Sequence, residues 1–445
     1  MIDFFNTTKD QCRSWLEYPY ETRLEMSKDC IRQVLTVAKN PYIQFSGGID
    51  SCVMFDIIYK IKPVIPVFND WGLFLPEQEK FCQEFMSKYT MPLITVSSGV
   101  TWQDFLTKRG FPIFKGFKYI KEEDYKELNI TKSCRSLKDK CWNTFYKNQT
   151  PDYYFVGMIH DESPQRKSLF IQHGFIIPKD KGILVKPIVL LKKSEVFRYA
   201  EENNVLYPKE YYKDTYNGRT ISFSHCDMGC FICGIRFGEF GFGRIGRLSR
   251  SRPDIFYKTM DLGLRKTLNH IITKYPFLEV DHIIQFLNEY DKPLKTGYDL
   301  DGVLCVMPKR PKPMMKQTGA QRKSYDFNKL KWFSETPCLW KPEKECYVIT
   351  GRREKNRIPT EAWLQKHKIP YKELIMMEGS LTFDNILNHK VKSIKKVGIE
   401  RYFEDDDKLA TAIQKACPNV QVILVPRDTS SYKIIDDTVL NPLSI

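Results

Sequence analysis

Long apolar runs are absent from this chain of 445 residues. The longest, such as Phe155–Ile159 and Val420–Val425, fall far short of the roughly 18 residues that a membrane helix needs. The amino end lacks the basic stretch followed by an apolar stretch that marks a secretory signal. No internal repeat or low-complexity tract interrupts the sequence. We therefore expect a cytoplasmic protein with no membrane partner.

The 13 cysteines are scattered through a long chain and are too sparse for a fold that depends on disulfides. Their number is odd, which fits a reducing compartment better than a secreted framework. In such a compartment, closely spaced cysteines indicate metal or redox sites before they indicate disulfides.

The composition is that of a folded protein, with 42% hydrophobic and 13% aromatic residues. A chain of this length predicts roughly two to four domains. Its 69 Lys and Arg against 54 Asp and Glu leave a net charge of +15. Such a surplus favours polyanionic partners such as nucleic acid, but it is equally common on ordinary solvated surfaces.

Short apolar strands alternate with helices from Tyr42 onward, after a helical segment over residues 1–40. This alternation predicts an α/β fold with a parallel sheet covered on both faces. The expected strands are Tyr42–Phe45, Pro63–Phe68, Leu93–Val96, Tyr153–Gly157 and Leu184–Lys186. The expected helices between and after them are Ser51–Ile61, Pro76–Tyr89 and Ser194–Asn203.

A second α/β pattern begins after helical residues 253–290, which places a domain boundary near Lys292–Pro293. Its expected strands are Gly297–Leu304, Cys346–Thr350, the end of Lys395–Phe403, and Val420–Val425, with a helix at Thr360–His367. The organisation is therefore an N-terminal helical segment (1–40), a parallel-sheet domain (41–210), a cysteine-rich and helical extension (211–293) and a smaller α/β domain (294–445). Within the last domain, the basic segment of residues 306–324 is predicted to form a loop.

The first candidate site is the turn between the first expected strand and helix, where residues 46–51 read SGGIDS. Bare backbone amides at such a turn, together with the helix dipole and two hydroxyls, suit a bound anion. Glycine allows the close backbone approach that a phosphate needs, although a plain strand-to-helix turn has the same pattern. The candidate ligands are Ser46, Gly47, Gly48, Asp50 and Ser51.

This turn resembles the signature of the PP-loop ATP pyrophosphatase superfamily, whose fold is adenine nucleotide alpha hydrolase-like. Residues 41–260 more narrowly resemble the phosphoadenosine phosphosulfate (PAPS) reductase family and its DNA phosphorothioation relatives. The further matching segments are 133–138, 156–166, 186–188 with 195–196, and 229–233. Met158–His160 and Leu190–Leu191 depart from the family pattern, which affects the expected substrate contacts.

The resemblance implies binding of ATP with release of pyrophosphate, because the phosphate loop is intact here whereas it is commonly degraded in the reductases. It implies that Asp50 positions Mg²⁺ on the pyrophosphate. Arg135, Lys138 and Arg166 are the implied phosphate clamps, although each is also an ordinary candidate for surface charge.

Cys226, Cys230 and Cys233 form the densest thiol cluster and suit a tetrahedral sulfur site, holding zinc or iron–sulfur. In relatives with a [4Fe–4S] cluster, the fourth cysteine lies in the segment that matches Cys134 here. Cys134 is therefore the expected fourth ligand, and Cys141 is the alternative. His225 is a further candidate zinc ligand, and a chance cluster of buried thiols is the alternative.

Five arginines follow, interleaved with phenylalanines, between Arg236 and Arg252. Arginines reach phosphates and aromatic rings stack on bases, so this segment suits a nucleic-acid surface. A glycine-rich loop with exposed arginines explains the pattern equally well.

The second candidate site is Asp299 and Asp301, two carboxylates at the end of an expected strand. Side chains two apart on a strand share a face, so both can approach one metal-bound phosphate unless a turn intervenes. The segment resembles the first motif of the haloacid dehalogenase (HAD) superfamily. Thr350, Lys390 and Asp405 match the later motifs in order, with Lys392 as the alternative to Lys390.

This resemblance implies a Rossmannoid phosphatase. Asp299 is then the nucleophile, Asp301 the acid and base, and Thr350 and Lys390 the phosphate contacts. Mg²⁺ is then held by Asp299, the Asp301 carbonyl and Asp405. The short interval from Arg352 to Lys390 leaves no room for a large cap, which favours large substrates such as polynucleotide ends.

Together these features predict a bifunctional enzyme that adenylylates a nucleotide or nucleic acid, transfers sulfur to it, and hydrolyses a phosphate ester. A sulfur-donor protein is a candidate partner. One alternative is a sulfonucleotide reductase fused to a phosphatase that removes the 3′-phosphate of its product. Another is a nucleic-acid-binding protein whose catalytic domains have lapsed.

Overall fold

The computed structural model describes residues 2–112, 120–131, 134–209, 213–216, 219–222, 244–276, 280–307, 333 and 335–426. The described residues up to 222 form one compact unit, and those from 244 onward form a second. Residues 244–291 therefore group with the second sheet, whereas the sequence analysis placed a boundary near Lys292–Pro293. One reason is that Tyr257 packs edge-on against Phe403 of that sheet, with ring centroids 5.6 Å apart.

The first unit alternates helices and strands. Its helices are α1 (Lys9–Trp15), α2 (Tyr20–Val37), α3 (Ile49–Ile61), α4 (Pro76–Lys88), α5 (Trp102–Arg109), α6 (Arg135–Asn148), α7 (Pro164–His173) and α8 (Lys193–Glu202). Its strands are β1 (Tyr42–Phe45), β2 (Ile65–Asp70), β3 (Ile94–Ser97), β4 (Phe111–Pro112), β5 (Ile130–Thr131), β6 (Tyr153–Val156), β7 (Ile176–Lys179), β8 (Gly182–Val185), β9 (Lys213–Tyr216) and β10 (Arg219–Ser222).

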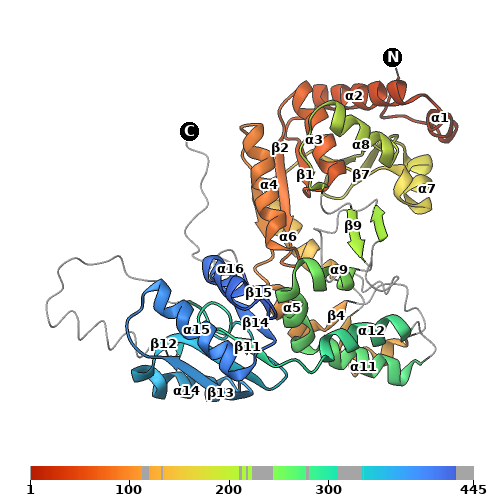
Figure 1. The fold of residues 1–445 in the computed structure, drawn as a ribbon. Helices are drawn as coiled ribbons and strands as arrows, with labels where there is room; N and C mark the ends of the chain where they lie inside the picture. Colours follow the sequence, from red (N-terminus) through yellow and green to blue (C-terminus); the bar gives the residue numbers. More distant parts are fainter. Residues whose placement is uncertain are drawn as a thin grey trace. The chain divides into compact units, whose positions relative to one another are not determined.

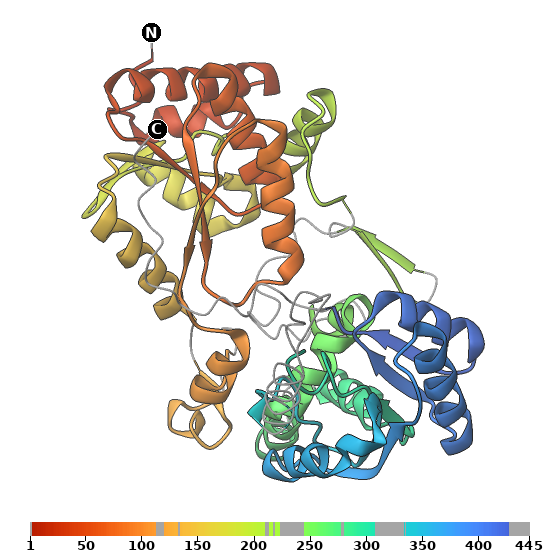
Figure 2. The same cartoon turned by 90° about the vertical axis from the view of Figure 1, so that its left-hand side faces the viewer.

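Six of these strands form one sheet in the order β3-β2-β1-β6-β8-β7. All neighbours pair in parallel except β7, which runs antiparallel to β8. Helices cover both faces of this sheet (Figures 1 and 2). The order of the strands in the sheet reverses its direction at β1, the strand that leads into residues 46–51. Ligands of open α/β sheets bind at such a point, beyond the carboxyl ends of the strands.

Alternate residues of β1 bury on opposite faces of the sheet. Tyr42 packs with Cys141 and Phe145 of α6, whereas Ile43 and Phe45 belong to the larger core beneath α2, α3 and α8. Because both faces of the strand are covered, its residues are mostly apolar, and Gln44 is the exception. The expected parallel sheet is thereby confirmed.

The second unit is also α/β. Its helices are α9 (Arg244–Ser251), α10 (Pro253–Thr259), a π-helical turn at Met260–Leu264, α11 (Arg265–Lys274), α12 (Val280–Asp291), α14 (Arg357–Lys366), α15 (Phe383–Val397) and α16 (Asp407–Ala416). Its strands are β11 (Thr296–Tyr298), β12 (Cys346–Arg353), β13 (Tyr371–Met377), β14 (Arg401–Glu404) and β15 (Gln421–Leu424).

The five strands form a wholly parallel sheet in the order β13-β12-β11-β14-β15. On one face, Ile349 and Tyr402 pack with residues of α15 and α16, including Ile394 and Ile413. On the other face, the ring of Tyr298 stacks on Phe403 at 4.7 Å. The central strand β11 is thus held between two cores.

The expected strand Gly297–Leu304 is wrong beyond its first two residues, because β11 ends at Tyr298. The chain then turns sharply: the amide of Cys305 donates to the carbonyl of Leu300 (2.9 Å), and Gly302 adopts φ +86°. This turn gives Asp301 a direction different from the one that a continued strand would give it.

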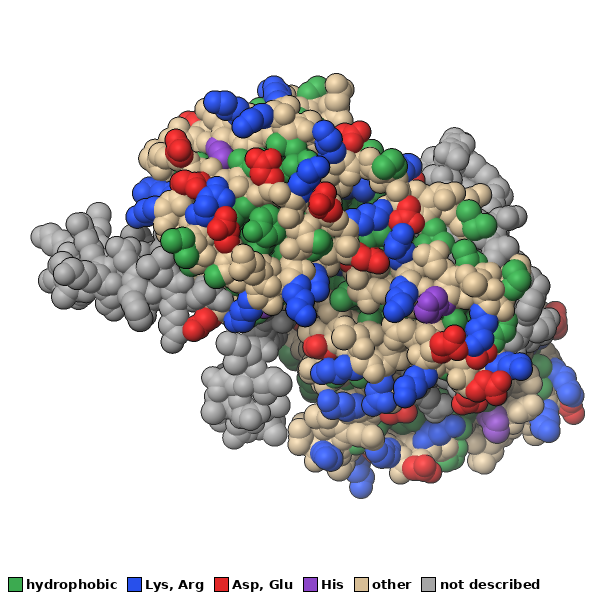
Figure 3. Space-filling view, turned by 90° about the horizontal axis from the view of Figure 1, so that it is seen from below, with side chains coloured by type: hydrophobic (Ala, Val, Ile, Leu, Met, Phe, Trp, Pro, Cys, Tyr) green, Lys and Arg blue, Asp and Glu red, His purple; other side chains and the backbone are tan. Residues whose placement is uncertain are grey.

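No helix in the described parts of the chain is long and apolar enough to cross a bilayer. On the face drawn in Figure 3, Lys and Arg side chains are interspersed with Asp and Glu over much of the coloured surface. This mixture fits the solvated-surface interpretation of the basic surplus on that face.

Candidate functional sites

The turn between β1 and α3 is shaped by Gly47, whose φ of +75° lies in the left-handed region. A Cβ at Gly47 would lie 2.7 Å from Gln78 Nε2 and 2.8 Å from Cys82 Sγ. Both the backbone conformation and the close neighbours therefore require glycine here. Gln78 fixes the turn further, because its Nε2 donates to the carbonyl of Ser46.

The two serines of the turn hold its ends together. Ser51 Oγ donates to the carbonyl of Gly48 (2.8 Å) and accepts from the amide of Ser46 (3.3 Å). Gly48 is the N-cap of α3, and no side chain of the described residues caps this helix. The helix therefore begins with its positive end at the turn, as an anion site requires.

The neighbouring strand β6 approaches the same turn through Gly157. A Cβ on Gly157 would lie 2.9 Å from the backbone nitrogen of Ser51 and 3.0 Å from the carbonyl oxygen of Asp50. This close approach of two backbones brings Gly157 next to the loop.

A network of charged side chains faces Asp50. Lys193 Nζ, at the start of α8, lies 2.6 Å from Asp50 Oδ2 and 3.5 Å from Glu162 Oε1. Glu162 also pairs with Arg166. Burial lowers the pKa of Arg166, and the charge of Asp50 opposes that shift. Lys193 was not predicted as a site residue, because only the tertiary fold brings α8 to the loop. Glu162 lies in the matching segment 156–166 but was given no role.

Of the other two implied phosphate clamps, only Lys138 has a side chain among the described residues. Lys138 is exposed and lies over the ring of Trp71, 5.1 Å from its centroid. The side chain of Arg135 lies outside the described residues. Arg166 is the implied clamp that lies, among the described side chains, in the charged network around Asp50.

The thiol cluster can be described only in part. Cys226, Cys230, Cys233 and His225 lie outside the described residues, whereas Cys134 is a half-buried N-cap of α6. Cys141, the reserve ligand, is buried and its thiol contacts the carbonyl of Asp70 at 3.5 Å. Of the arginine-rich segment after the cluster, residues 236–243 also lie outside the described part.

The second site surrounds Asp299, which follows the central strand β11 and is buried. Lys390 Nζ, from α15, lies 2.8 Å from Asp299 Oδ2 and 2.6 Å from Glu404 Oε2. Lys390 is buried whereas Lys392 is exposed, so Lys390 is the lysine at this site. Glu404 was not predicted, although the acidic run at residues 404–407 was the available signal.

Three buried carboxylates gather here, from Asp299, Glu404 and Asp405, with ligand oxygens within 4.8 Å of one another. Burial raises the pKa of Asp299 to about 7, and Lys390 opposes that shift. Burial alone would lower the pKa of Lys390, but Asp299, Tyr402 and Glu404 hold it well above its ordinary value. A second cation besides Lys390 would stabilise the charged form of these crowded carboxylates.

Gly302 allows the turn after β11 to touch this group. At φ +86°, a Cβ on Gly302 would overlap the carboxylate of Asp405. The glycine after Asp301 is therefore required by the close approach of two loops that carry acidic residues.

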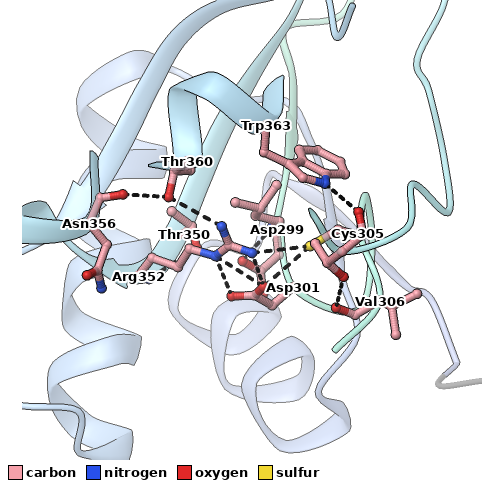
Figure 4. Close-up of polar contacts among 11 residues, drawn as sticks. Asp299, Asp301, Cys305, Val306, Thr350, Arg352, Asn356, Thr360 and Trp363 are labelled. Carbon is pink, nitrogen blue, oxygen red and sulfur yellow. Dashed lines mark hydrogen bonds and ion pairs between the residues drawn. The ribbon is translucent and has the colours of Figure 1, made fainter. Parts of the chain in front are cut away.

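Asp301 turns toward Arg352 of β12 (Figure 4). Arg352 Nη2 donates to Asp301 Oδ1 at 2.7 Å, and its Nε lies 3.0 Å from Oδ2. Arg352 is itself buried and also donates to Thr360 Oγ1. Thr350, two residues earlier, is buried and accepts from the amide of Arg352 (3.1 Å). Arg352 is thus a site residue that the sequence analysis quoted but gave no role.

Comparisons with known proteins bear on the first site. Residues 40–253 match the family model of the phosphoadenosine phosphosulfate reductase domain. This match supports a domain of that family, within the PP-loop superfamily, over these residues. A search of curated proteins found no match.

Solved structures show weaker similarity. The PAPS reductase of Candida auris in its phosphate complex is 17% identical, covers 49% of this chain and 100% of its own, and gives a TM-score of 0.32. The FMN adenylyltransferase of Candida glabrata in complex with ATP is 13% identical, covers 46% of this chain and 65% of its own, and gives a TM-score of 0.30. Similarities this low add nothing to the family match.

Proposed function

We propose that the protein is a bifunctional enzyme. Its first unit binds ATP at residues 46–51 and adenylylates an oxygen of a nucleotide or nucleic acid with release of pyrophosphate. Sulfur from a donor protein then displaces AMP from the activated position. Its second unit hydrolyses a phosphate ester. The observation that carries the hydrolase half is the buried group of Asp299, Lys390, Glu404 and Asp405 at the carboxyl edge of a parallel sheet.

The order of the second sheet supports this half. Asp299 follows the central strand, Thr350 lies on the neighbour β12, and Glu404 ends the other neighbour, β14. The carboxyl ends of parallel strands meet at one edge, so three separate motifs converge there. This placement supports the proposal of a HAD-type phosphatase.

In the hydrolytic step, a carboxylate oxygen of Asp299 attacks phosphorus and displaces the ester oxygen, forming an aspartyl-phosphate. Lys390 and Thr350 hold the phosphoryl oxygens. Asp301 gives a proton to the leaving oxygen and later accepts one from the attacking water. Arg352 fixes the orientation of Asp301 through two of its nitrogens.

A hard divalent cation such as Mg²⁺ fits this site, because all three buried donors are carboxylates. Asp299, Glu404 and Asp405 would hold it, and the ion would screen the charge that otherwise repels a phosphate from Asp299.

The first unit supports nucleotide activation through the geometry of its loop. Gly47 and Gly48 place backbone without side chains at the positive end of α3. Lys193 and Arg166 lie beside Asp50. Asp50 and Glu162 share Lys193, so Lys193 has to turn toward the phosphates before a cation can join these acids. Mg²⁺ at Asp50, and iron–sulfur or zinc at Cys134, Cys226, Cys230 and Cys233, stay predictions.

Two assays test the halves separately. Asp299→Asn should lower release of phosphate from p-nitrophenyl phosphate on the order of 10³-fold or more, because it removes the nucleophile. Glu373→Gln, at an exposed acid of β13, is the matched control and should leave turnover unchanged. Full activity in Asp299→Asn would refute the hydrolase half.

Pyrophosphate release from ATP tests the other half. We expect pyrophosphate release in the wild type and a large loss of that release in Asp50→Asn. Asp29→Asn, which changes an exposed acid of α2, should release pyrophosphate as the wild type does. The family match favours a second candidate, a sulfonucleotide reductase. Thiol-dependent consumption of PAPS without pyrophosphate release from ATP would replace the first proposal with this one.

A further inference from the structure

A cavity of about 550 Å³ lies within the second unit, away from the carboxylates of the phosphate site. Its lining includes Thr296 at the start of β11, Cys346 at the start of β12 and Arg401 at the start of β14. Because these strands are parallel, the cavity opens at their amino ends, whereas Asp299 and Glu404 lie at their carboxyl ends. Tyr257 of α10 and Tyr290 of α12 complete the wall.

Arg401 is the unusual member of this lining. Only 4% of its surface is exposed. Its Nε donates to Gln421 Oε1 (2.9 Å), and its guanidinium lies 4.3 Å from the centroid of Tyr257. Among the described residues, no carboxylate forms an ion pair with Arg401. A buried guanidinium charge without an anion is costly, so a partner from outside the chain would stabilise it.

Most other charges of the cavity are matched, although the exposed Glu345 also belongs to its lining. Asp291 lies 2.9 Å from both Arg265 and Lys344, and Lys292 pairs with Glu289 at 2.7 Å.

Asp261 is likewise satisfied, because it accepts from the hydroxyl of Tyr290, from Trp340 Nε1 (2.7 Å) and from the amide of Glu343 (3.1 Å). Its carboxylate is therefore not the anion that Arg401 lacks.

Two phenols add hydrogen-bond donors to the wall. Tyr257 and Tyr298 line the cavity, and no hydrogen bond of either hydroxyl is found among the described residues. Burial raises the pKa of Tyr257 to about 12, so its hydroxyl keeps its proton at neutral pH and can donate. A guanidinium and two phenols form a set of donors that suits an oxygen anion.

We propose that this cavity binds a small organic oxyanion, a carboxylate or a phosphate ester, with its anionic group on Arg401. A volume of about 550 Å³ is within the range of metabolite pockets and exceeds what inorganic phosphate alone would fill. The site is independent of the phosphate chemistry at Asp299.

Crystals of the full chain soaked separately in citrate and in inorganic phosphate, without divalent metal, test this directly. We expect ordered density on Arg401 from at least one of them, and the one that binds identifies the preferred anion. Titration calorimetry should give the same preference at a Kd below about 1 mM. Water alone in the cavity, with no binding of either probe, would overturn the proposal.

Variants locate the binding. Arg401→Met should weaken the affinity roughly tenfold or more, because it removes the charged donor. Lys408→Gln, at an exposed site of α16, should leave it unchanged. If Arg401→Met fails to fold, Tyr298→Phe keeps the ring stack and removes one donor, and should weaken binding a few-fold. Unchanged affinity in Tyr298→Phe and in a folded Arg401→Met would refute a site at Arg401.

Discussion

Replacing Lys390 by Met would remove the cation that, among the described residues, touches both Asp299 and Glu404. The Nζ lies 2.8 Å and 2.6 Å from their oxygens, and all three side chains are at most 9% exposed. Removal leaves two buried carboxylates without their cation. Breaking a buried pair in this way costs about 3–5 kcal/mol. Lys392→Met, two residues along the same helix and exposed, is the matched control with an expected effect within about 0.5 kcal/mol.

The loss of stability in Lys390→Met should depend on pH. Burial raises the pKa of Asp299 to about 7, so the native protein binds this proton more tightly than the unfolded chain does. The contribution of Asp299 to stability is therefore present below its ordinary pKa of 3.8 and is lost as pH rises toward 7. Without Lys390 the pKa rises further, so the deficit of Lys390→Met should be large at about pH 8 and smaller at about pH 5.

Hydrogen exchange is the suitable assay, because a chain of two compact units does not give a single free energy of unfolding. Peptides covering β11 and β14 should lose protection in Lys390→Met, in metal-free buffer, whereas peptides of the first unit should not. Equal protection in the Lys390 and Lys392 variants, or a deficit that does not change with pH, would refute the reasoning.

Three further predictions concern the two sites. Gly47→Ala should abolish ATP binding, measured by calorimetry, because its φ of +75° and the contact with Gln78 both exclude a side chain; unchanged affinity would contradict the loop geometry. Arg352→Gln should lower kcat of phosphate release roughly 10²-fold with little change in KM, since Asp301 loses its fixed orientation; a change in KM alone would argue against this role. Gly302→Ala should reduce stimulation by Mg²⁺ in a metal titration, because its Cβ would displace Asp405; a wild-type titration curve would show that the turn has no such role.

Local patterns in the sequence predicted much of the first unit. The strand Tyr42–Phe45 has the predicted bounds, and α3 begins at Ile49, two residues before its predicted start. These elements depend on neighbouring residues: an apolar run, a pair of glycines and then a helix. Strand β13 (Tyr371–Met377) was missed because Lys372 and Glu373 interrupt its apolar pattern.

The candidate sites were predictable only where a motif lies within one segment. Asp299, Thr350 and Lys390 were each named from a motif within one segment. The structure brings Lys390 Nζ to 2.8 Å from Asp299 Oδ2, and the catalytic roles of the three stay a prediction. Lys193 and Arg352 could not be predicted as site residues. Each gains its role from an ion pair with a residue far away in the sequence, which no local pattern reveals.

The hydrolase half is tested most directly by trapping its covalent intermediate. The full chain, mixed with p-nitrophenyl phosphate and Mg²⁺ and quenched in acid during turnover, should yield a phosphorylated peptide. Mass spectrometry should place the phosphate on Asp299, and Asp299→Asn should show none. Turnover without any phosphorylated peptide, or phosphate on another residue, would contradict the account.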